Sequence, residues 1–474
     1  MRKNRPYTYL GTVMGMCRDC RELVPNRLAE EGGSVFQERL CPTCGTSRAL
    51  IAEDVGWYLR TVATPCISKA PSSSTYPVSA GCPMDCGPCA FHASGCTLPV
   101  FSVTNACDMR CPICFTYNRD DRTYFMSRSE LKRILDGVLE RSGPVDLINV
   151  TGGEPTLHPD LAGLLRECRR PGIGRVTVNS NGLRLARDPD LCRVLADMGV
   201  YVILSLHTLK PECSVAIHGR DVVREKLQAL ENLDRAGVGT TLLNVLIGGT
   251  NEDELGALVD LAKAYRNVRS LTIQTMTYTG QGGGAFHPRA HVPLDAAARL
   301  LEAGTGGAMA REHFFPHPSA HPLCYSVAFF LRSSEGWRSL TDLVDPTTLR
   351  DLLSGGYLPS VHGLSAATFQ EAVDRCWAEG RDDALLGQMR GLLAKMFPAG
   401  GLTPFQRQRI AEESLLTVYL HSHMDEDTLD LGRLSTCPDQ VPDADGRLVP
   451  ACAYNLFYRM KDPKFWAEEQ SGEA

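Results

Sequence analysis

The sequence has no apolar run near the roughly 18 residues that a membrane-spanning helix needs, so a membrane-spanning protein is excluded. It also has no excess of positive charge. The formal net charge is −6, whereas a nucleic-acid partner normally requires a basic surface. The basic segment at residues 1–6 is followed by neither a proper hydrophobic region nor a small-residue cleavage site, so export is not expected. Peripheral contact with a membrane stays open.

The chain has 474 residues, too many for one compact core, and two or three folding units are expected. Its 19 cysteines are the unusual feature, because 12 of them lie between Cys17 and Cys114. Disulfide scaffolds are usually short chains that cannot build a core, and this chain can build one. We therefore expect a reducing cytoplasm, in which clustered thiols are metal ligands.

Two cysteine pairs open the chain, each with two residues between its members. Four thiolates on two such loops suit tetrahedral coordination of zinc or iron, and the spacing does not distinguish the two metals. A zinc ribbon that binds nucleic acid or protein is the alternative for this segment. The four predicted ligands are Cys17, Cys20, Cys41 and Cys44.

From about residue 98, strand-like and helix-like segments alternate, which predicts βαβ units and a parallel sheet. The expected strands are residues 99–104, 146–150, 175–179, 200–206, 240–246 and 270–275. The expected helices are residues 128–140, 160–169, 188–197, 222–236 and 252–265. Because the pattern stops after six strands, we predict an α/β fold with a partial (β/α)6 barrel. The glycine-rich run at residues 280–284 is expected to be flexible backbone, and residues 70–75 a linker.

Two cysteine triads share the spacing Cys-x3-Cys-x2-Cys. Cys107, Cys111 and Cys114 directly follow a predicted strand, and three thiolates on one tight loop can hold three irons of a [4Fe–4S] cluster. The fourth iron would then be open to a small ligand. The other triad is followed by a fourth cysteine, Cys96, which could bind the fourth iron of a cluster and leave no open iron. This closed set is Cys82, Cys86, Cys89 and Cys96. Zinc or inert core thiols are the alternatives at both triads.

A glycine pair and a carboxylate, Gly152, Gly153 and Glu154, follow the predicted strand at residues 146–150. Glycines allow the backbone to approach a ligand closely, and Glu154 can accept a hydrogen bond from an ammonium group. Coming one βα unit after Cys107, Cys111 and Cys114, this motif resembles the radical S-adenosylmethionine (SAM) superfamily over about residues 98–276. The resemblance implies that SAM chelates the open iron.

The same resemblance implies further cofactor contacts at the carboxyl ends of strands, where α/β barrels place their chemistry. Gly152, Gly153 and Glu154 would meet the amino group of SAM. The other implied contacts are Asn179, Ser180 and Asn181 at the ribose or carboxylate, and Val245 and Leu246 beside the adenine.

The flanking cysteines resemble those of archaeal tetraether lipid synthases and class D radical SAM methyltransferases. In that group, the first four cysteines would form a rubredoxin-like site, and Cys324, Cys437 and Cys452 would hold a second auxiliary [4Fe–4S] cluster. Core packing is the alternative for each of these three. The fourth ligand is open between Cys66, His321 and an external group. Departures from that group at residues 204–209, where His207 lies, and at Ala451 are near the expected substrate space and leave a substrate other than a lipid open.

The resemblance implies an enzyme that cleaves SAM to a 5′-deoxyadenosyl radical and forms a carbon–carbon bond at an unactivated carbon, as in lipid-chain coupling. The first alternative is a class D-like C-methyltransferase acting on a pterin or another small molecule. The second is a multi-cluster iron–sulfur electron carrier. An external reductant such as flavodoxin or ferredoxin is the implied partner. The expected domains are a rubredoxin-like unit at 1–64, an auxiliary segment at 65–97, the radical SAM barrel at 98–276 and a substrate and auxiliary-cluster region at 277–474.

Overall fold

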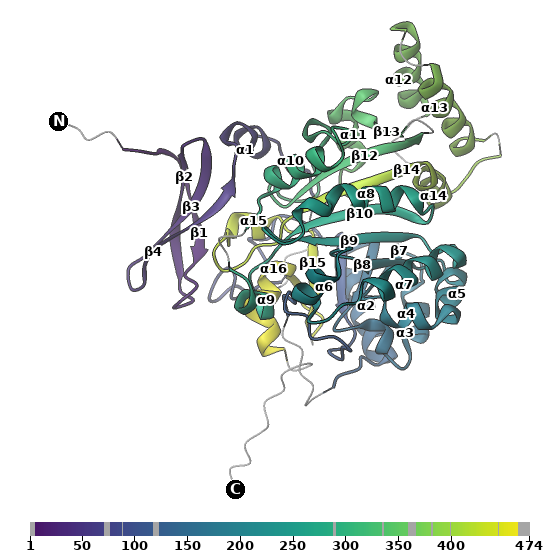
Figure 1. Ribbon diagram of the computed structural model, residues 1–474. Helices are drawn as coiled ribbons and strands as arrows, with labels where there is room; N and C mark the ends of the chain where they lie inside the picture. The colour runs from purple at the N-terminus through teal and green to yellow at the C-terminus, as the bar shows by residue number, and fades with distance from the viewer. Residues whose placement is uncertain are drawn as a thin grey trace.

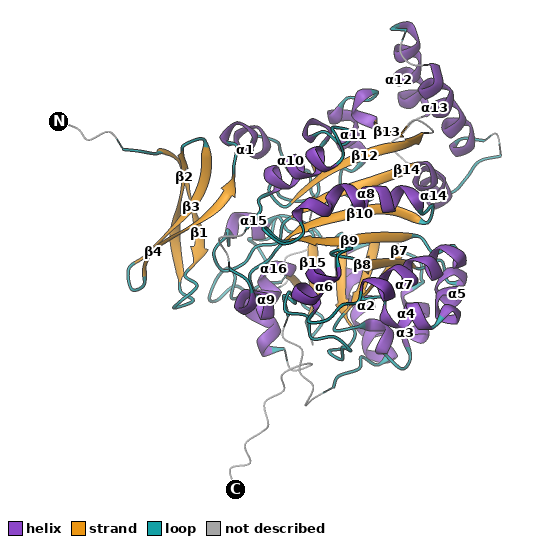
Figure 2. Cartoon of the chain, in the orientation of Figure 1, coloured by secondary structure: helices purple, strands orange, loops and turns teal. Residues whose placement is uncertain are grey.

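The computed structural model describes residues 5–70, 76–87, 89–116, 123–287, 291–333, 336–358, 366–380, 383–398, 400–443 and 445–462. These residues form a four-stranded sheet near the N-terminus and a 12-stranded sheet that carries most of the helices (Figures 1 and 2). Most of the predicted linker, residues 71–75, lies outside the described residues. Within the described ranges, no helix combines the length and hydrophobicity needed to cross a membrane.

The N-terminal sheet is an antiparallel meander in the order β1-β2-β3-β4. Its second turn contains only Gly32 and Gly33, both with positive φ, as a two-residue hairpin turn requires. The two cysteine pairs lie at the other turns, β1–β2 and β3–β4. The elements are β1 (Thr8–Met16), β2 (Leu23–Glu31), β3 (Ser34–Cys41), β4 (Gly45–Ala52) and the following helix α1 (Val55–Val62).

All six predicted strands of the barrel are present, and each pairs in parallel with the next. They are β5 (Leu98–Ser102), β6 (Val145–Thr151), β7 (Ile173–Ser180), β8 (Tyr201–Ser205), β9 (Thr240–Leu246) and β10 (Val268–Thr275). The predicted helices are present too, and their apolar faces share one core with the strands. The helices of this region are α2 (Arg128–Ser142), α3 (Leu161–Cys168), α4 (Leu183–Arg187), α5 (Pro189–Asp197), α6 (Pro211–His218), α7 (Val223–Ala236) and α8 (Leu255–Ala264), with short turns η1 (Pro155–Leu157) and η2 (Glu252–Glu254).

The C-terminal region extends this sheet at both edges, which the sequence pattern did not indicate. On one side, β14 (Leu415–His421) pairs in parallel with β10, and β12 (Tyr325–Ser333) pairs antiparallel with β14. On the other side, β15 (Asp439–Pro442) pairs in parallel with β5. The remaining strands are β11 (Phe315–Pro316) and β13 (Gly336–Ser339), which pair with β12, and β16 (Leu448–Pro450), which pairs with β15. Segments far apart in sequence therefore pair with both edges of the barrel sheet.

The glycine-rich run is helical, so the prediction of flexible backbone there is wrong. It forms α9 (Gly280–Ala285), and Gly282 N donates to Cys114 O at 2.9 Å. Glycines are needed because the helix packs against the backbone of the cysteine loop. A β-carbon at Gly280 would overlap the carbonyl of Phe115.

The helices between residues 346 and 414 form a second apolar core with β12. Helices α12 and α13 project away from the barrel at the top of Figure 1. The C-terminal helices after α9 are α10 (Leu294–Gly304), α11 (Pro346–Leu352), α12 (Ala366–Ala378), α13 (Asp383–Met396), α14 (Pro404–Ser414), α15 (Leu431–Ser435) and α16 (Ala451–Ala453). Short turns are η4 (Arg311–His313), η5 (Leu340–Asp342), η6 (Tyr454–Tyr458) and η7 (Arg459–Lys461).

Candidate functional site

The four N-terminal cysteines converge on one point. The Sγ atoms of Cys17, Cys20, Cys41 and Cys44 all lie within 4.8 Å of one another, and Cys20 Sγ is 3.7 Å from Cys41 Sγ. A tetrahedral site with metal–sulfur bonds of about 2.3 Å has sulfur atoms about 3.8 Å apart. Burial raises the pKa of Cys17, but backbone N–H groups of Cys20 and Asp19 outweigh it and lower that pKa to about 7. The predicted ligand set therefore has the geometry of a metal site.

The triad of Cys107, Cys111 and Cys114 lies on the loop that leaves the carboxyl end of β5. All three thiols are half-buried, and Cys111 Sγ is 3.6 Å from His218 Nδ1. Burial raises the pKa of Cys107 to about 12 and that of Cys111 to about 11. The buried Lys226 cation opposes this effect at Cys111, so a positive charge favours thiolate at the loop.

Two glycine segments hold this loop. Gly152 and Gly153 pack on the backbone of Thr104 and Ala106 so closely that a β-carbon at either glycine would overlap a carbonyl oxygen. Gly153 N donates to Thr104 O, and Glu154 N donates to Ala106 O, both at 2.7 Å. Helix α9 packs on the other end of the loop. The cysteine loop is thus fixed by backbone contacts on both sides.

Glu154 is buried and joins the ends of β6 and β7. Its Oε1 accepts hydrogen bonds from Thr156 N at 3.1 Å, Thr156 Oγ1 at 2.6 Å and Ser180 Oγ at 2.9 Å. Its Oε2 accepts from Asn181 N at 2.7 Å. Burial raises the pKa of Glu154, while these donors lower it. The carboxylate is therefore firmly positioned, and Oε2 retains capacity for one more donor.

The other predicted cofactor residues lie near this loop in different ways. Asn181 Nδ2 donates to Asp108 Oδ1 at 2.7 Å, which ties the end of β7 to the residue after Cys107. Within the described part of the chain, the buried Oδ1 of Asn179 has no hydrogen-bond partner. Val245 and Cys111 both pack against the apolar cluster that contains Ile113. Leu246 is buried in the barrel core instead.

His207 lies at the end of β8, and its ring stacks on His218 with centroids 5.1 Å apart. Its Nδ1 accepts a hydrogen bond from Val245 N at 3.1 Å. Burial, together with the charge of Lys226, lowers the pKa of His207 to about 3, so the ring is neutral near pH 7. The hydrogen bond places the remaining proton on Nε2.

The second triad is brought together only in part. Cys82 and Cys86 share a hydrogen bond that raises the pKa of Cys86, and Cys89 is close enough to interact electrostatically with Cys86. Cys96 is buried in the barrel core instead, where Asp439 and Lys69 are its charged neighbours. Its role as a fourth ligand stays a prediction.

Cys324, Cys437 and Cys452 come from three distant segments and lie within electrostatic range of one another. Burial raises the pKa of Cys437, and the charges of Asp439, Cys452 and Cys324 raise it further. Cys66 also lies within electrostatic range of Cys324. This convergence is consistent with the predicted auxiliary site and brings the spare thiol near it.

Two histidines near these thiols were missed from the sequence. His423 Nδ1 lies 3.5 Å from Cys452 Sγ, and the rings of His421 and His423 are 4.2 Å apart. Arg433 Nη2 donates to Cys324 Sγ at 3.4 Å. The sequence feature that could have identified them is a His-x-His pair directly after the apolar run at residues 415–420. If that run is predicted to be a strand, both histidines lie at its carboxyl end.

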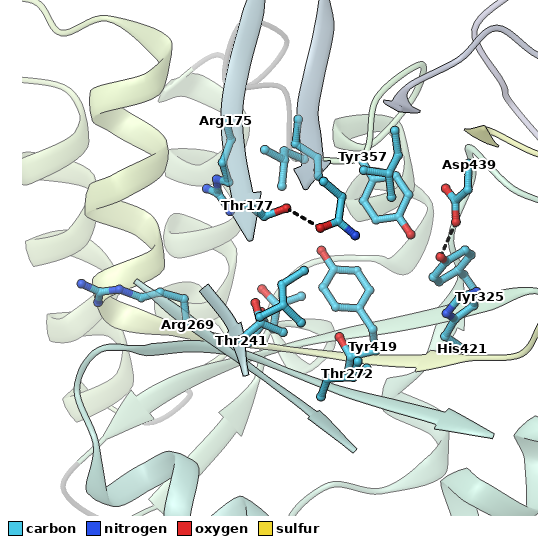
Figure 3. A pocket seen from close by; sticks show the side chains of 18 of the residues that line it. Arg175, Thr177, Thr241, Arg269, Thr272, Tyr325, Tyr357, Tyr419, His421 and Asp439 are labelled. Carbon is cyan, nitrogen blue, oxygen red and sulfur yellow. Dashed lines mark hydrogen bonds between the residues drawn. The ribbon is translucent and has the colours of Figure 1, made fainter. Parts of the chain in front are cut away.

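A cavity of about 310 Å³ connects the cofactor-side residues with the C-terminal strands (Figure 3). That volume suits a small-molecule ligand. Part of the lining is apolar and comes from α11 and α13, whereas aromatic and polar side chains from β12, β14 and β15 line another part. Lining residues include Gly152, Asn179, Arg175, Thr177, Arg269, Tyr325, Tyr357, Tyr419, His421, Asp439, Leu349, Leu352, Met389, Leu392 and Met396.

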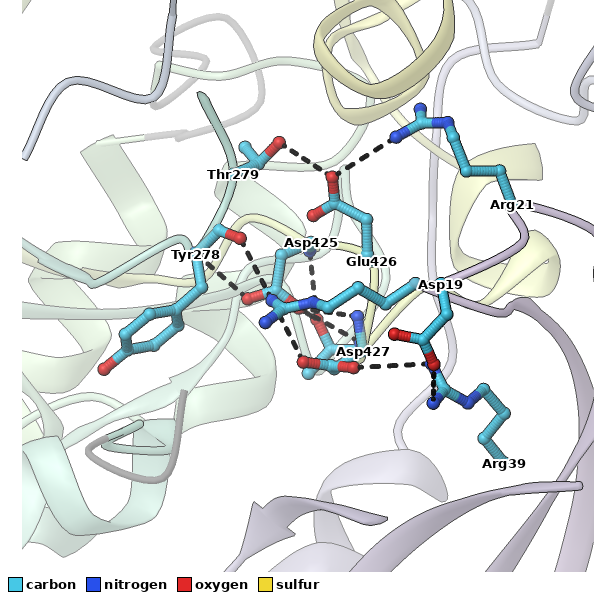
Figure 4. A network of polar contacts seen from close by, with 10 residues as sticks. Asp19, Arg21, Arg39, Tyr278, Thr279, Asp425, Glu426 and Asp427 are labelled. Carbon is cyan, nitrogen blue, oxygen red and sulfur yellow. Dashed lines mark hydrogen bonds and ion pairs between the residues drawn. The ribbon is translucent and has the colours of Figure 1, made fainter. Parts of the chain in front are cut away.

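The N-terminal sheet is fixed to the barrel by an acidic loop at residues 425–427 (Figure 4). Arg18, between Cys17 and Cys20, forms an ion pair with Asp427 at 3.0 Å and donates to Tyr278 O at 3.2 Å. Tyr278 N in turn donates to Asp425 at 3.1 Å. Because α9 begins two residues after Tyr278, these contacts connect the N-terminal metal site with the helix that packs on the cysteine loop.

Family comparisons agree with this arrangement. Residues 101–262 match the Radical SAM superfamily, and residues 9–53 match the HMPTM N-terminal zinc ribbon domain. The predicted partial barrel and the N-terminal metal domain are therefore confirmed. The auxiliary cluster sites stay predictions.

One relative matches from end to end. The 7,8-dihydro-6-hydroxymethylpterin dimethyltransferase of Methanocaldococcus jannaschii is 25% identical over 95% of this chain and 94% of its own length. The GTP 3′,8-cyclase of Chlorobaculum tepidum is 34% identical, but over only 37% of this chain and 51% of its own length. Among solved structures, Streptococcus suis SuiB bound to S-adenosylmethionine has a TM-score of 0.39 at 22% identity, covering 45% of this chain and 48% of SuiB.

Proposed function

Because the chain is a radical SAM enzyme with an N-terminal zinc ribbon, we propose that it methylates an unactivated carbon of a pterin-class small molecule. The observation that carries the proposal is the match to a pterin dimethyltransferase across 95% of this chain. That match includes the N-terminal cysteines and the C-terminal region, not the barrel alone. The match to a cyclase is partial and covers only 37% of this chain.

This proposal corresponds to the alternative drawn from the sequence, and it replaces lipid-chain coupling as the favoured reaction. A lipid chain needs a long apolar groove. The cavity of about 310 Å³ instead combines an apolar portion with polar groups such as Thr177, Asp439 and His421. That mixture suits a compact heterocycle better than a long alkyl chain. The electron-carrier alternative is not favoured, because the chain matches the Radical SAM superfamily and a carrier needs no substrate cavity.

For the catalytic centre, we propose that Cys107, Cys111 and Cys114 hold a [4Fe–4S] cluster with one open iron for SAM. The donor set fits, because three thiols lie on a loop that is clamped by glycines whose β-carbons would not fit. When bound, the cluster and SAM supply an electron and a 5′-deoxyadenosyl radical for hydrogen abstraction. The loop contacts at Gly152 and Gly153 fix the position of the cysteines.

The proposed cofactor contacts follow the strand ends. Oε2 of Glu154 has the spare acceptor capacity that an ammonium group needs, and Asn179 lines the cavity. Gly152 also lines that cavity. Ser180 and Asn181 hold Glu154 in place, so their proposed role is positioning. Val245 and Leu246 stay proposed neighbours of the adenine.

The remaining metal sites are proposed in the same way. Cys82, Cys86, Cys89 and Cys96 would hold one auxiliary cluster, and Cys324, Cys437 and Cys452 another. The N-terminal four-cysteine site would hold zinc or iron, and zinc is favoured by the ribbon match. Flavodoxin or ferredoxin is the proposed reductant, in a cytoplasmic setting.

The test is anaerobic turnover of the reconstituted protein with SAM, a reductant, a folate-class one-carbon donor and 7,8-dihydro-6-hydroxymethylpterin, because the SAM that is cleaved to the radical keeps its methyl group on methionine. We expect 5′-deoxyadenosine to form together with a methylated pterin, and roughly twelve cluster irons, four for each of three clusters. Mass spectrometry of the pterin, after separate turnovers with the one-carbon donor labelled and with the SAM methyl group labelled, identifies the product and the source of its added carbon. Absence of any methylated pterin, with SAM cleavage intact, would refute the proposed substrate class.

A further inference from the structure

Asp439 at the start of β15 is a buried carboxylate with one unsatisfied oxygen. The residue is 5% exposed, and its Oδ2 accepts a hydrogen bond from Tyr325 Oη at 2.5 Å. Its Oδ1 is buried and has no hydrogen-bond partner among the described residues. A buried acceptor without a partner is costly, which makes a missing ligand the natural partner.

Aromatic rings fix the position of this carboxylate (Figure 3). The ring of Tyr325 stacks on His421 with centroids 3.8 Å apart and planes 7° apart. Tyr357 packs edge-on against Tyr325 at 5.6 Å. Because the Tyr325 ring is packed on two sides, its hydroxyl has a fixed position. The hydrogen bond from this hydroxyl therefore restricts the orientation of the Asp439 carboxylate. Flat aromatic walls beside a fixed acceptor suit a planar heterocycle.

The carboxylate and the proposed cofactor residues line the same cavity. Gly152 and Asn179 belong to its wall together with Asp439 and Tyr325. A ligand held at Asp439 would therefore share an enclosed space with the proposed SAM site. Figure 3 shows Asp439 at the opposite end from Arg175 and Arg269, so neither guanidinium neutralises it there.

We propose that Asp439 binds the adjacent N–H donors of a 2-amino-4-oxopyrimidine edge, with Tyr325 as its positioning residue. This inference rests on the proposed pterin substrate and names the group that selects it. In its ionised form a carboxyl group only accepts hydrogen bonds, and the pyrimidine edge of a pterin presents a ring N–H beside an amino group. Burial raises the pKa of Asp439 to about 7, and two N–H donors would favour the ionised form. A lipid chain presents no such donors. A site built on this pairing rejects analogues that lack a donor, because its buried acceptor stays unpaired.

The experiment compares two pteridines on the reconstituted holoenzyme by calorimetry. 6-Hydroxymethylpterin carries the 2-amino donor, and 6-hydroxymethyl-lumazine has a carbonyl acceptor at that position. We expect the native enzyme to prefer the pterin by at least about tenfold. Asp439→Asn presents an amide donor to the cavity, and we expect it to weaken pterin binding about tenfold and to shift the preference toward the lumazine.

The matched control is Asp295→Asn. Asp295 is also buried, and its Oδ1 also has no hydrogen-bond partner among the residues that the structure describes. Its Oδ2 accepts a hydrogen bond from Asp54 N at 2.8 Å, and Asp295 does not line the cavity. We expect this variant to keep the native preference. Tyr325→Phe should reduce pterin affinity without reversing the preference, because it removes only the group that orients Asp439.

Each outcome decides between the two proposals. If the native enzyme methylates the pterin but Asp439→Asn binds both pteridines as the native enzyme does, the role of Asp439 is refuted and the proposed function stands. If Asp439→Asn changes the iron content or the paramagnetic spectrum and leaves the preference intact, Asp439 is a ligand of the neighbouring cluster instead. If the native enzyme binds neither pteridine while still cleaving SAM, both proposals fail.

Discussion

Gly280 packs against Phe115 so closely that a β-carbon at Gly280 would overlap the Phe115 carbonyl oxygen. Phe115 directly follows Cys114, the last cysteine of the predicted cluster loop. The helix after the barrel's last predicted strand is therefore a support for that loop. The glycine-rich sequence at residues 280–284 predicts a flexible segment, but in the structure this segment makes a tight backbone contact.

Gly280→Ala should displace the cysteine loop. The added methyl group has no room, and Gly280 has a φ of 62°, which strains other residues. We expect a loss of roughly 1–3 kcal/mol in stability and a lower iron content after reconstitution. Gly284→Ala is the control, because nothing lies within 4 Å of a β-carbon there. Equal iron content and equal melting temperature in the two variants would contradict the proposed support.

Substitution of the loop cysteines should separate cofactor cleavage from product formation. Cys107→Ala, Cys111→Ala or Cys114→Ala should abolish 5′-deoxyadenosine formation, since each removes a proposed iron ligand. Cys452→Ala should retain cleavage and block the methylated product, and liquid chromatography of both products measures this split. Cys168→Ala, in the barrel core, should retain both activities. A Cys452→Ala variant that forms product at the native rate would show that its proposed auxiliary role is wrong.

The N-terminal sheet should depend on its metal. Cys41→Ser removes one of four converging thiols, and small metal domains lose much of their folding energy with the metal. We expect loss of about one equivalent of zinc or iron and faster hydrogen exchange confined to β1–β4. Cys192→Ser tests specificity, because Cys192 lies in helix α5 in the barrel core, where its thiol donates to Leu185 O, and it does not belong to the four-cysteine group. Unchanged metal content in Cys41→Ser would exclude the four-cysteine site.

Acid should destabilise the protein through its buried histidines. Burial lowers the pKa of His317 from 6.5 to about 4, so the unfolded chain binds more protons than the folded protein between these values. Stability is therefore complete above pH 6.5 and is lost as the pH falls toward 4, by roughly 3 kcal/mol at most for this residue. His317→Asn should reduce the difference in melting temperature between pH 7.5 and pH 5. A matching reduction in His287→Asn, an exposed position, would remove His317 as the cause.

Docking of the N-terminal sheet should depend on Arg18. Its ion pair with Asp427 at 3.0 Å is only partly exposed, with 29% and 19% of the two side chains accessible. A double-mutant cycle with Arg18→Ala and Asp427→Ala should give a coupling of about 1 kcal/mol, which is near the upper end for exposed pairs. The cycle is measured by denaturant unfolding. Additive effects of the two substitutions would mean that the pair does not hold the sheet.

The sequence by itself determined the local and repetitive features. Apolar segments between residues 98 and 276 predict strands and helices, because the spacing of apolar residues differs between a helix and a strand that each bury one face. The four N-terminal cysteines and the triad at Cys107 are legible because metal ligands on one loop have fixed spacing. The glycine pair before Glu154 is legible for the same reason. All of these signals act over a few tens of residues.

Only the tertiary structure decided which distant segments meet. β14 joins β10, and β15 joins β5, although more than a hundred residues separate each pair, and no local pattern encodes such a pairing. The same closure brings Cys324, Cys437 and Cys452 together and places Cys96 in the core. It also sets Asp439 beside Tyr325 in the cavity. Long-range contacts of this kind depend on how the whole chain packs, because the free energy that selects them comes from burial shared by all the elements.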